Sequence, residues 1–367
     1  MEKTYVANTV IEQDDYQKII KLLEESDPFV LSPSNIKEKY KIDQYRLASL
    51  RGDLRLKVLL DNNIFTRILP LAKGDSLEVG SQSDKATGLA CAIMSFFIMG
   101  GFDIEFTLPL YERAYCKSKG SREEDLYYFR VADNLHPQVY ADVALGKKDR
   151  FPSHDLEFAK NMVDKEYPPM DCSLFDEIPV HWKHIYIKLL KACAVWKDTQ
   201  SNMERVKRYI QWVRENSLFI PATESFVLLF FSENRLSKMI KGINSNNKEK
   251  LIQGARNAAW DLLYITYWAE KAEKEQGKTI WLICSNDKVL KKIGESIFIV
   301  KGADRDSFLG GLFEEYWGEK NGMRVLEIYK ALENEVKSEK VKRDKFIQEL
   351  ELHLDSDVHN YEQAIRT

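Results

Sequence analysis

A short apolar run that ends abruptly in an acid is the feature that most constrains the fold of this chain. The run, Leu56-Lys57-Val58-Leu59-Leu60, is followed at once by Asp61 and then by an amphipathic segment from Ile64. Because its apolar residues are continuous rather than alternating, we predict a buried strand of a parallel sheet. Asp61 then lies at the carboxyl end of that strand, where ligands bind in open α/β sheets. The alternative is that Asp61 only caps the helix that begins near Ile64.

The composition excludes several classes of protein. The 367 residues are enough for two domains or one large one, and a hydrophobic fraction of 44% is that of an ordinary soluble protein. A net charge of −3 provides no global positive field, so any contact with nucleic acid must come from local patches. The five cysteines form no CxxC pair, which argues against a disulfide framework and a structural zinc site. We therefore expect a cytoplasmic protein.

Neither the first residues of the chain nor its most apolar stretch predicts a membrane protein. The first residues lead into mixed charged sequence, so no signal peptide is expected. The apolar residues 88–102 are too few for a membrane span and predict a buried helix.

The pattern of strands and helices predicts an α/β fold, with a mainly parallel sheet flanked by helices. Residues 54–118 and 250–305 form a discontinuous core, in which we expect strands at 58–60, 102–108, 279–284 and 296–300. Residues 1–53 are predicted to be a helical extension, 119–249 a mainly helical insertion, and 306–367 a C-terminal helical region. For residues 226–231 the sequence leaves strand and helix open.

Three further acids lie near strand ends. Glu112 opens a helix after a strand, Asp261 lies in a helix that precedes the next strand, and Asp287 follows that strand. Several carboxylates in one cleft cannot all stay ionised without compensation, which Mg²⁺ or Mn²⁺ would supply. Such a cation suits phosphodiester hydrolysis. Glu105 and Asp103 compete with Glu112, and each acid taken alone also fits a helix cap or a solvated surface charge.

The ordered set of acids resembles the PIN-domain nucleases of the PIN-like superfamily. The resemblance covers under half of the chain, and it is carried by Leu60-Asp61-Asn62-Asn63, Leu110-Tyr111-Glu112, Ala258-Ala259-Trp260-Asp261 and Ser285-Asn286-Asp287. It implies that Asp61, Glu112 and Asp287 bind the metal and that Asp261 is a ligand or orients water. It also implies that Asn63 and Ser285 support the carboxylates through hydrogen bonds. The gap between Glu112 and Asp261 is far longer than in compact members of the family.

Four basic residues near these acids are predicted to bind the phosphate backbone of a substrate, although a solvated helix face explains them equally well. They are Arg113, Arg256, Lys288 and Lys291. His181 and His184 are spaced i, i+3 on an expected helix, but no further Cys or His stands close enough in sequence to complete a zinc site.

The sequence therefore predicts a metal-dependent endoribonuclease of PIN-like type, with an RNA substrate and no membrane partner. The aromatic residues of the insertion either stack on single-stranded bases or pack the core. A catalytically inactive PIN-like scaffold and a DNA-directed structure-specific nuclease are the alternatives. The amphipathic stretch 323–354 is compatible with a homodimer formed through C-terminal helices.

Overall fold

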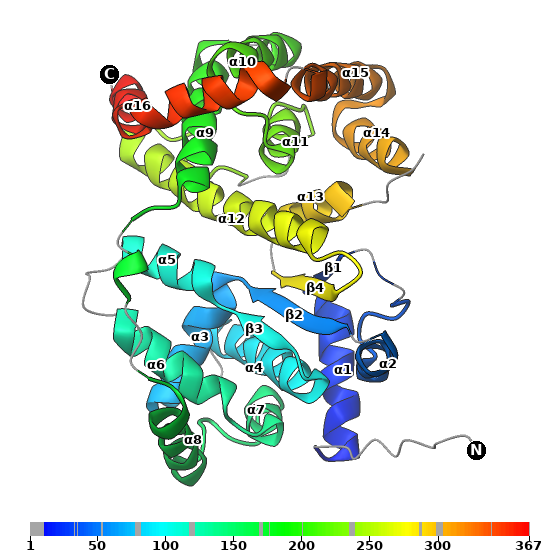
Figure 1. Cartoon of the computed structure of the whole chain (residues 1–367), viewed down its shortest axis with the longest axis vertical. Helices are drawn as coiled ribbons and strands as arrows, with labels where there is room; N and C mark the ends of the chain where they lie inside the picture. The colour runs from blue at the N-terminus through cyan, green and yellow to red at the C-terminus, as the bar shows by residue number, and fades with distance from the viewer. Residues whose placement is uncertain are drawn as a thin grey trace. The chain divides into compact units, whose positions relative to one another are not determined.

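The chain folds into two compact units, and each is built from two separate stretches of sequence (Figure 1). The computed structural model describes residues 11–366 apart from 33, 35, 53, 78–81, 117–121, 169–171, 176, 200, 235–238, 286–287, 299–303 and 339. Unit 1 comprises Met1–Glu177 and Lys271–Asn286, and unit 2 comprises Ile178–Glu270 and Asp287–Thr367. The stretch 119–249, predicted to be one insertion, is thus divided between the two units.

A four-stranded mixed sheet lies at the centre of unit 1, in the order β1-β4-β2-β3 (Figure 1). The strands are β1 (Phe29–Leu31), β2 (Arg55–Leu60), β3 (Asp103–Glu105) and β4 (Thr279–Cys284). β2 runs parallel to both β3 and β4, whereas β1 pairs with β4 in the antiparallel direction. The predicted α/β class, with a sheet flanked by helices, is confirmed.

The two central strands, β2 and β4, end side by side. Their register pairs Leu60 with Cys284, and all six residues of β4 are buried. Continuous burial explains why β4 and residues 58–60 of β2 have uninterrupted rather than alternating apolar sequences. The residues that follow them, Asp61 and Ser285, therefore meet at one edge of the sheet.

Helices cover this sheet and carry most of the hydrophobic core of unit 1. They are α1 (Gln13–Ser26), α2 (Ile42–Gly52), α3 (Asn62–Lys73), α4 (Gln82–Gly100), α5 (Thr107–Cys116), α6 (Arg122–Asp133), α7 (Pro137–Ala144) and α8 (Ser153–Glu166), with a 3₁₀ turn at Cys172–Phe175. The helix predicted from the apolar residues 88–102 is α4, and its Phe96 and Phe97 rings lie about 5 Å from the ring of Phe29 in β1. These aromatic contacts bind α4 to the edge of the sheet.

Four local predictions need correction. The N-terminal 53 residues are not only helical, because β1 lies among them. The strand predicted at 102–108 is only three residues long, since α5 already begins at Thr107 with Pro109 in its first turn, a position that tolerates proline. Residues 296–298, predicted as a strand, belong to helix α13 (Lys288–Phe298), and 299–300 lie outside the described residues. The amphipathic stretch 323–354, expected to be one long helix, is divided between α15 (Glu319–Ser338) and α16 (Lys340–Arg366).

Throughout its described residues, unit 2 consists of helices and their connections. The helices are α9 (Val180–Asp198), α10 (Asn202–Asn216), α11 (Pro221–Phe230), α12 (Lys248–Lys274, whose last turn belongs to unit 1), α13 (Lys288–Phe298), α14 (Asp304–Trp317), α15 (Glu319–Ser338) and α16 (Lys340–Arg366). The ambiguous stretch 226–231 lies in and just after α11, which is buried on all sides from Ala222 to Phe230. No helix in the described ranges is both long enough and apolar enough to cross a membrane.

Unit 2 contains a fully buried ion pair. The Nζ atom of Lys188 in α9 donates to Oε1 of Glu224 in α11, and both side chains have no exposed surface. Glu224 also accepts from the hydroxyl group of Tyr209 in α10, at 2.7 Å, and from the backbone N–H of Ile220, at 3.1 Å. These contacts satisfy the carboxylate and connect three helices within the apolar interior.

His184, one turn before Lys188, predicts a pH dependence of stability. Burial, followed by the charges of His181 and Lys188, lowers the pKa of His184 to about 4, whereas an unfolded histidine has a pKa of about 6.5. Between these values the unfolded chain binds a proton that the folded chain does not. The free energy of unfolding therefore falls as the pH decreases through this window, by about 2 kcal/mol between pH 7 and pH 5.

Urea unfolding of the full chain at these two pH values checks this contribution. His184→Phe should lose less stability on acidification than the wild type, by about that same 2 kcal/mol. The quantity to compare is the change in the free energy of unfolding between the two pH values. Any loss of stability that the substitution causes equally at both pH values cancels in this difference. If both proteins lose the same stability, His184 does not stay neutral in the folded protein.

Candidate functional site at the carboxyl ends of strands β2 and β4

Asp61 lies at the carboxyl end of β2 and is 6% exposed. Its backbone N–H extends the pairing with β4 by donating to the carbonyl oxygen of Cys284, at 3.1 Å. Asp61 is also the N-cap residue of α3, and its Oδ1 atom accepts from the backbone N–H of Asn63 at 3.0 Å. The cap that the sequence left as an alternative is therefore present, and it engages one of the two carboxylate oxygens.

Ser285, at the end of the neighbouring strand, contacts the other carboxylate oxygen. Its hydroxyl group donates to Oδ2 of Asp61 at 3.0 Å, and its backbone N–H donates to the carbonyl oxygen of Pro28 at 2.9 Å. The side-chain amide of Asn63 lies 3.3 Å from both oxygens of Asp61. The structure thus brings Asp61, Asn63 and Ser285 together, and it fixes the carboxylate through donors from two elements.

Asn62, which the sequence argument did not single out, adds a further oxygen next to Asp61. Its Oδ1 atom is buried and has no hydrogen-bond partner among the described residues. A buried carbonyl oxygen without a donor is uncommon, and it is a good ligand for a hard cation. Its position directly after the acid was the available sequence signal.

Glu112 lies in α5, a helix of the same unit that begins near the same edge of the sheet. The turn from β3 into α5 is fixed by a hydrogen bond of 2.9 Å from the N–H of Thr107 to Oε1 of Glu105. Glu105, one of the acids that competed with Glu112, therefore caps the start of α5. Asp103, the other competitor, stands at the opposite end of β3, where it pairs in register with Lys57.

The remaining two predicted acids are not placed at this edge. Asp261 is half-buried in α12 and belongs to unit 2. Asp287 lies outside the described residues. The described part of the chain contains no group of three or more His, Cys, Asp or Glu side chains arranged to hold a metal ion. Asp61 and Asn62 nevertheless offer the oxygen donors that Mg²⁺ and Mn²⁺ prefer.

Two of the four basic residues predicted to bind substrate contact other parts of the protein. Arg113 is buried in α5, where its Nε atom donates to Oδ2 of Asp125 at 2.5 Å. Arg256 donates to Oε1 of Glu362, at 2.6 Å, and to the hydroxyl oxygen of Tyr186, at 3.2 Å. Both guanidinium groups therefore differ from the solvent-facing cations expected at a substrate site. Lys291 is half-buried in α13, and the side chain of Lys288 lies outside the described part.

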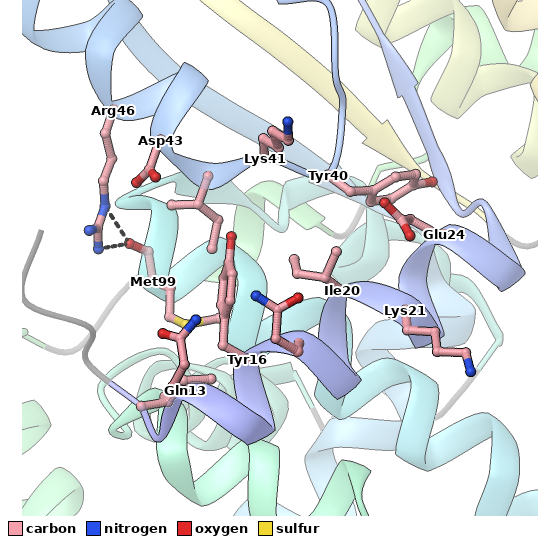
Figure 2. Close-up of a pocket in the computed structure, with 13 residues that line it drawn as sticks. Gln13, Tyr16, Ile20, Lys21, Glu24, Tyr40, Lys41, Asp43, Arg46 and Met99 are labelled. Carbon is pink, nitrogen blue, oxygen red and sulfur yellow. Dashed lines mark hydrogen bonds between the residues drawn. The ribbon is translucent and has the colours of Figure 1, made fainter.

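A separate groove of about 850 Å³ lies between α1 and the start of α2, away from every predicted site residue. Figure 2 shows the side chains of Tyr16 and Ile20 on its α1 wall. At its end, Arg46 donates from Nε to the carbonyl oxygen of Met99, at 3.0 Å, and so caps the last turn of α4 (Figure 2). Its lining mixes apolar groups with charges of both signs, which selects no single class of ligand.

The Asp61 cluster therefore stands as the candidate site on its geometry alone. It lies where ligands bind in open α/β sheets, and its carboxylate is buried and fixed from two elements. No protein-family model, no curated protein and no solved structure matches this chain.

Proposed function

We propose that this protein is a metal-dependent nuclease of PIN-like type that hydrolyses RNA phosphodiester bonds, with Mg²⁺ or Mn²⁺ bound at Asp61. The observation that carries the proposal is the buried carboxylate of Asp61, held at the carboxyl end of β2 by Ser285 from β4. The resemblance to PIN-like nucleases supplies the substrate class.

The way in which Asp61 is held favours a ligand over a simple helix cap. A cap needs only the N–H groups of its own helix, which Asn63 supplies. The hydroxyl group of Ser285 comes from another strand and fixes the second oxygen, as the outer hydrogen bonds around metal-binding carboxylates do. Because both oxygens are oriented in advance, little conformational freedom remains to be lost when a cation binds.

The proposed site takes its oxygen ligands from Asp61, Glu112 and Asp287. Only the resemblance to PIN-like nucleases implies that Asp261, a residue of unit 2, serves as a further ligand or orients the attacking water. When bound, the metal ion activates that water and stabilises the negative charge on the scissile phosphate. Asn63 and Ser285 keep the Asp61 carboxylate in one orientation, and the carbonyl oxygen of Asn62 is an additional donor on the same turn.

Incubation of the purified full chain with single-stranded RNA and single-stranded DNA of the same sequence tests the proposal. Each substrate is supplied with Mn²⁺, with Mg²⁺ or with EDTA, and products are resolved on a denaturing gel. We expect internal cleavage of RNA that requires a divalent cation and stops with EDTA. Cleavage of DNA in preference to RNA would show that the substrate is DNA and that the proposed RNA substrate is wrong. A folded protein that binds Mn²⁺ and cleaves neither would favour a catalytically inactive scaffold.

A further inference from the structure

Arg113 is the immediate neighbour of Glu112 in sequence, and it forms a buried ion pair with Asp125. The side chain of Arg113 is 10% exposed and that of Asp125 in α6 is 2% exposed, with 2.5 Å between Nε and Oδ2. The contact joins the helix that carries Glu112 to α6.

The guanidinium group of Arg113 also contacts the helix that begins at Asp61. It lies over the ring of Phe65, with Cζ 5.9 Å from the ring centroid. Phe65 stands one helical turn after Asp61, and its ring stacks on that of Phe129 in α6, with centroids 4.7 Å apart. One side chain therefore connects α3, α5 and α6 within a turn of both proposed ligands, Asp61 and Glu112.

Stability alone does not account for a buried pair of this kind. Desolvation of the two charges offsets much of their attraction, so apolar side chains of similar volume would stabilise the helices as well. The pair does fix the relative orientation of its two side chains, because the planar guanidinium group donates hydrogen bonds to a carboxylate only along its N–H bonds. The Arg113–Asp125 pair therefore limits the rotation of α5 about its own axis. Because Glu112 is on the same helix, the pair also limits the directions in which the Glu112 side chain can point.

We infer that the Arg113–Asp125 pair is a positioning element that holds Glu112 in the orientation required by the metal site at Asp61. This inference rests on the proposed nuclease function. It assigns Arg113 a role different from the substrate contact expected from the sequence, since a buried and paired guanidinium group acts through the position of its helix.

A double substitution separates positioning from simple stabilisation. The variants are Arg113→Met, Asp125→Leu and the two combined, and the readouts are thermal unfolding and the Mn²⁺ concentration for half-maximal cleavage. Each single variant breaks the Arg113–Asp125 pair but keeps one of its two buried charges, so it should unfold at lower temperature, whereas the double variant should recover. If the pair positions Glu112, the double variant still needs about 10- to 100-fold more Mn²⁺, with a smaller change in kcat.

Asp15→Asn provides the matched control in the same unit. Asp15 is a buried acid of α1 that pairs with Lys147 at 2.6 Å, so this variant should lose stability without needing more Mn²⁺. A double variant that folds and needs no more Mn²⁺ than the wild type would overturn the inference while the proposed function stands. If the wild-type protein neither binds Mn²⁺ in a direct titration nor cleaves RNA, the inference and the proposed function are both wrong.

Discussion

Asp61→Asn is expected to abolish metal-dependent cleavage while leaving the fold intact. Asparagine caps a helix as well as aspartate does, and its Oδ1 atom still accepts a hydrogen bond, so the stability should change by less than about 1 kcal/mol. The variant loses the negative charge that binds the cation. We expect kcat/KM to fall by about 10³-fold or more, which corresponds to a loss of about 4 kcal/mol of transition-state stabilisation. Initial rates at saturating Mn²⁺, beside urea unfolding, measure both quantities.

Two companion variants make this result specific. Asp149→Asn removes the same charge from an exposed pair with Arg150 in unit 1 and should leave the rate unchanged. Ser285→Ala removes the hydrogen bond to Oδ2 of Asp61 but keeps the carboxylate, so a smaller loss of about 10- to 100-fold is expected. Retention of wild-type cleavage by the Asp61 variant would exclude this carboxylate as a metal ligand.

Glu224→Gln is expected to cost about 3–5 kcal/mol of folding free energy, because it removes the negative charge of a fully buried ion pair with Lys188. Glutamine can still accept from the hydroxyl group of Tyr209, so lost hydrogen bonding explains only part of the effect. Lys188→Met should have a cost of similar size, since it removes the positive charge beside the buried carboxylate of Glu224. Chemical denaturation followed by tryptophan fluorescence checks both values.

An ion pair on the same helix with one exposed partner is the control for this prediction. Lys183 of α9 lies 2.5 Å from Asp355 of α16, whose side chain is 84% exposed. Asp355→Asn should therefore change stability by less than about 1 kcal/mol. Equal effects at the two pairs would mean that the interior around Glu224 admits water.

The sequence predicted those elements whose stability is mainly local. Residues 58–60 of β2 and all of β4 are short apolar runs, and α3 is an amphipathic segment that begins directly after its capping residue Asp61. Such signals lie within a few positions of one another. The same reasoning placed Asp61 at the carboxyl edge of the sheet, because ligands bind where parallel strands end. The hydrogen bonds from Asn63 and Ser285 were expected from the resemblance to PIN-like nucleases, and both contact Asp61. β1 was not predicted, since its three residues form a strand only through pairing with β4, some 250 positions later in the sequence.

The remaining differences have the same non-local origin. Residues 296–298 include the strand-forming residues Ile297 and Phe298, yet they continue α13, because β propensity depends strongly on context. The roles of Arg113 and Arg256 depend on partners in other helices, Asp125 and Glu362, so their sequence neighbourhoods resemble those of exposed cations. The metal-binding role of the four acids stays a prediction.

The sheet of unit 1 has a consequence for the order in which the protein can fold during synthesis. β4 lies between β1 and β2, but the ribosome makes it only after residues 178–270, which belong to unit 2. Until β4 emerges, β1 has no partner strand and Asp61 has no Ser285 beside it. The folding of unit 2 in turn requires residues 287–367, which are made after β4. A nascent chain halted before β4 would therefore lack the candidate site, so any catalytic activity there arises only after β4 has been made.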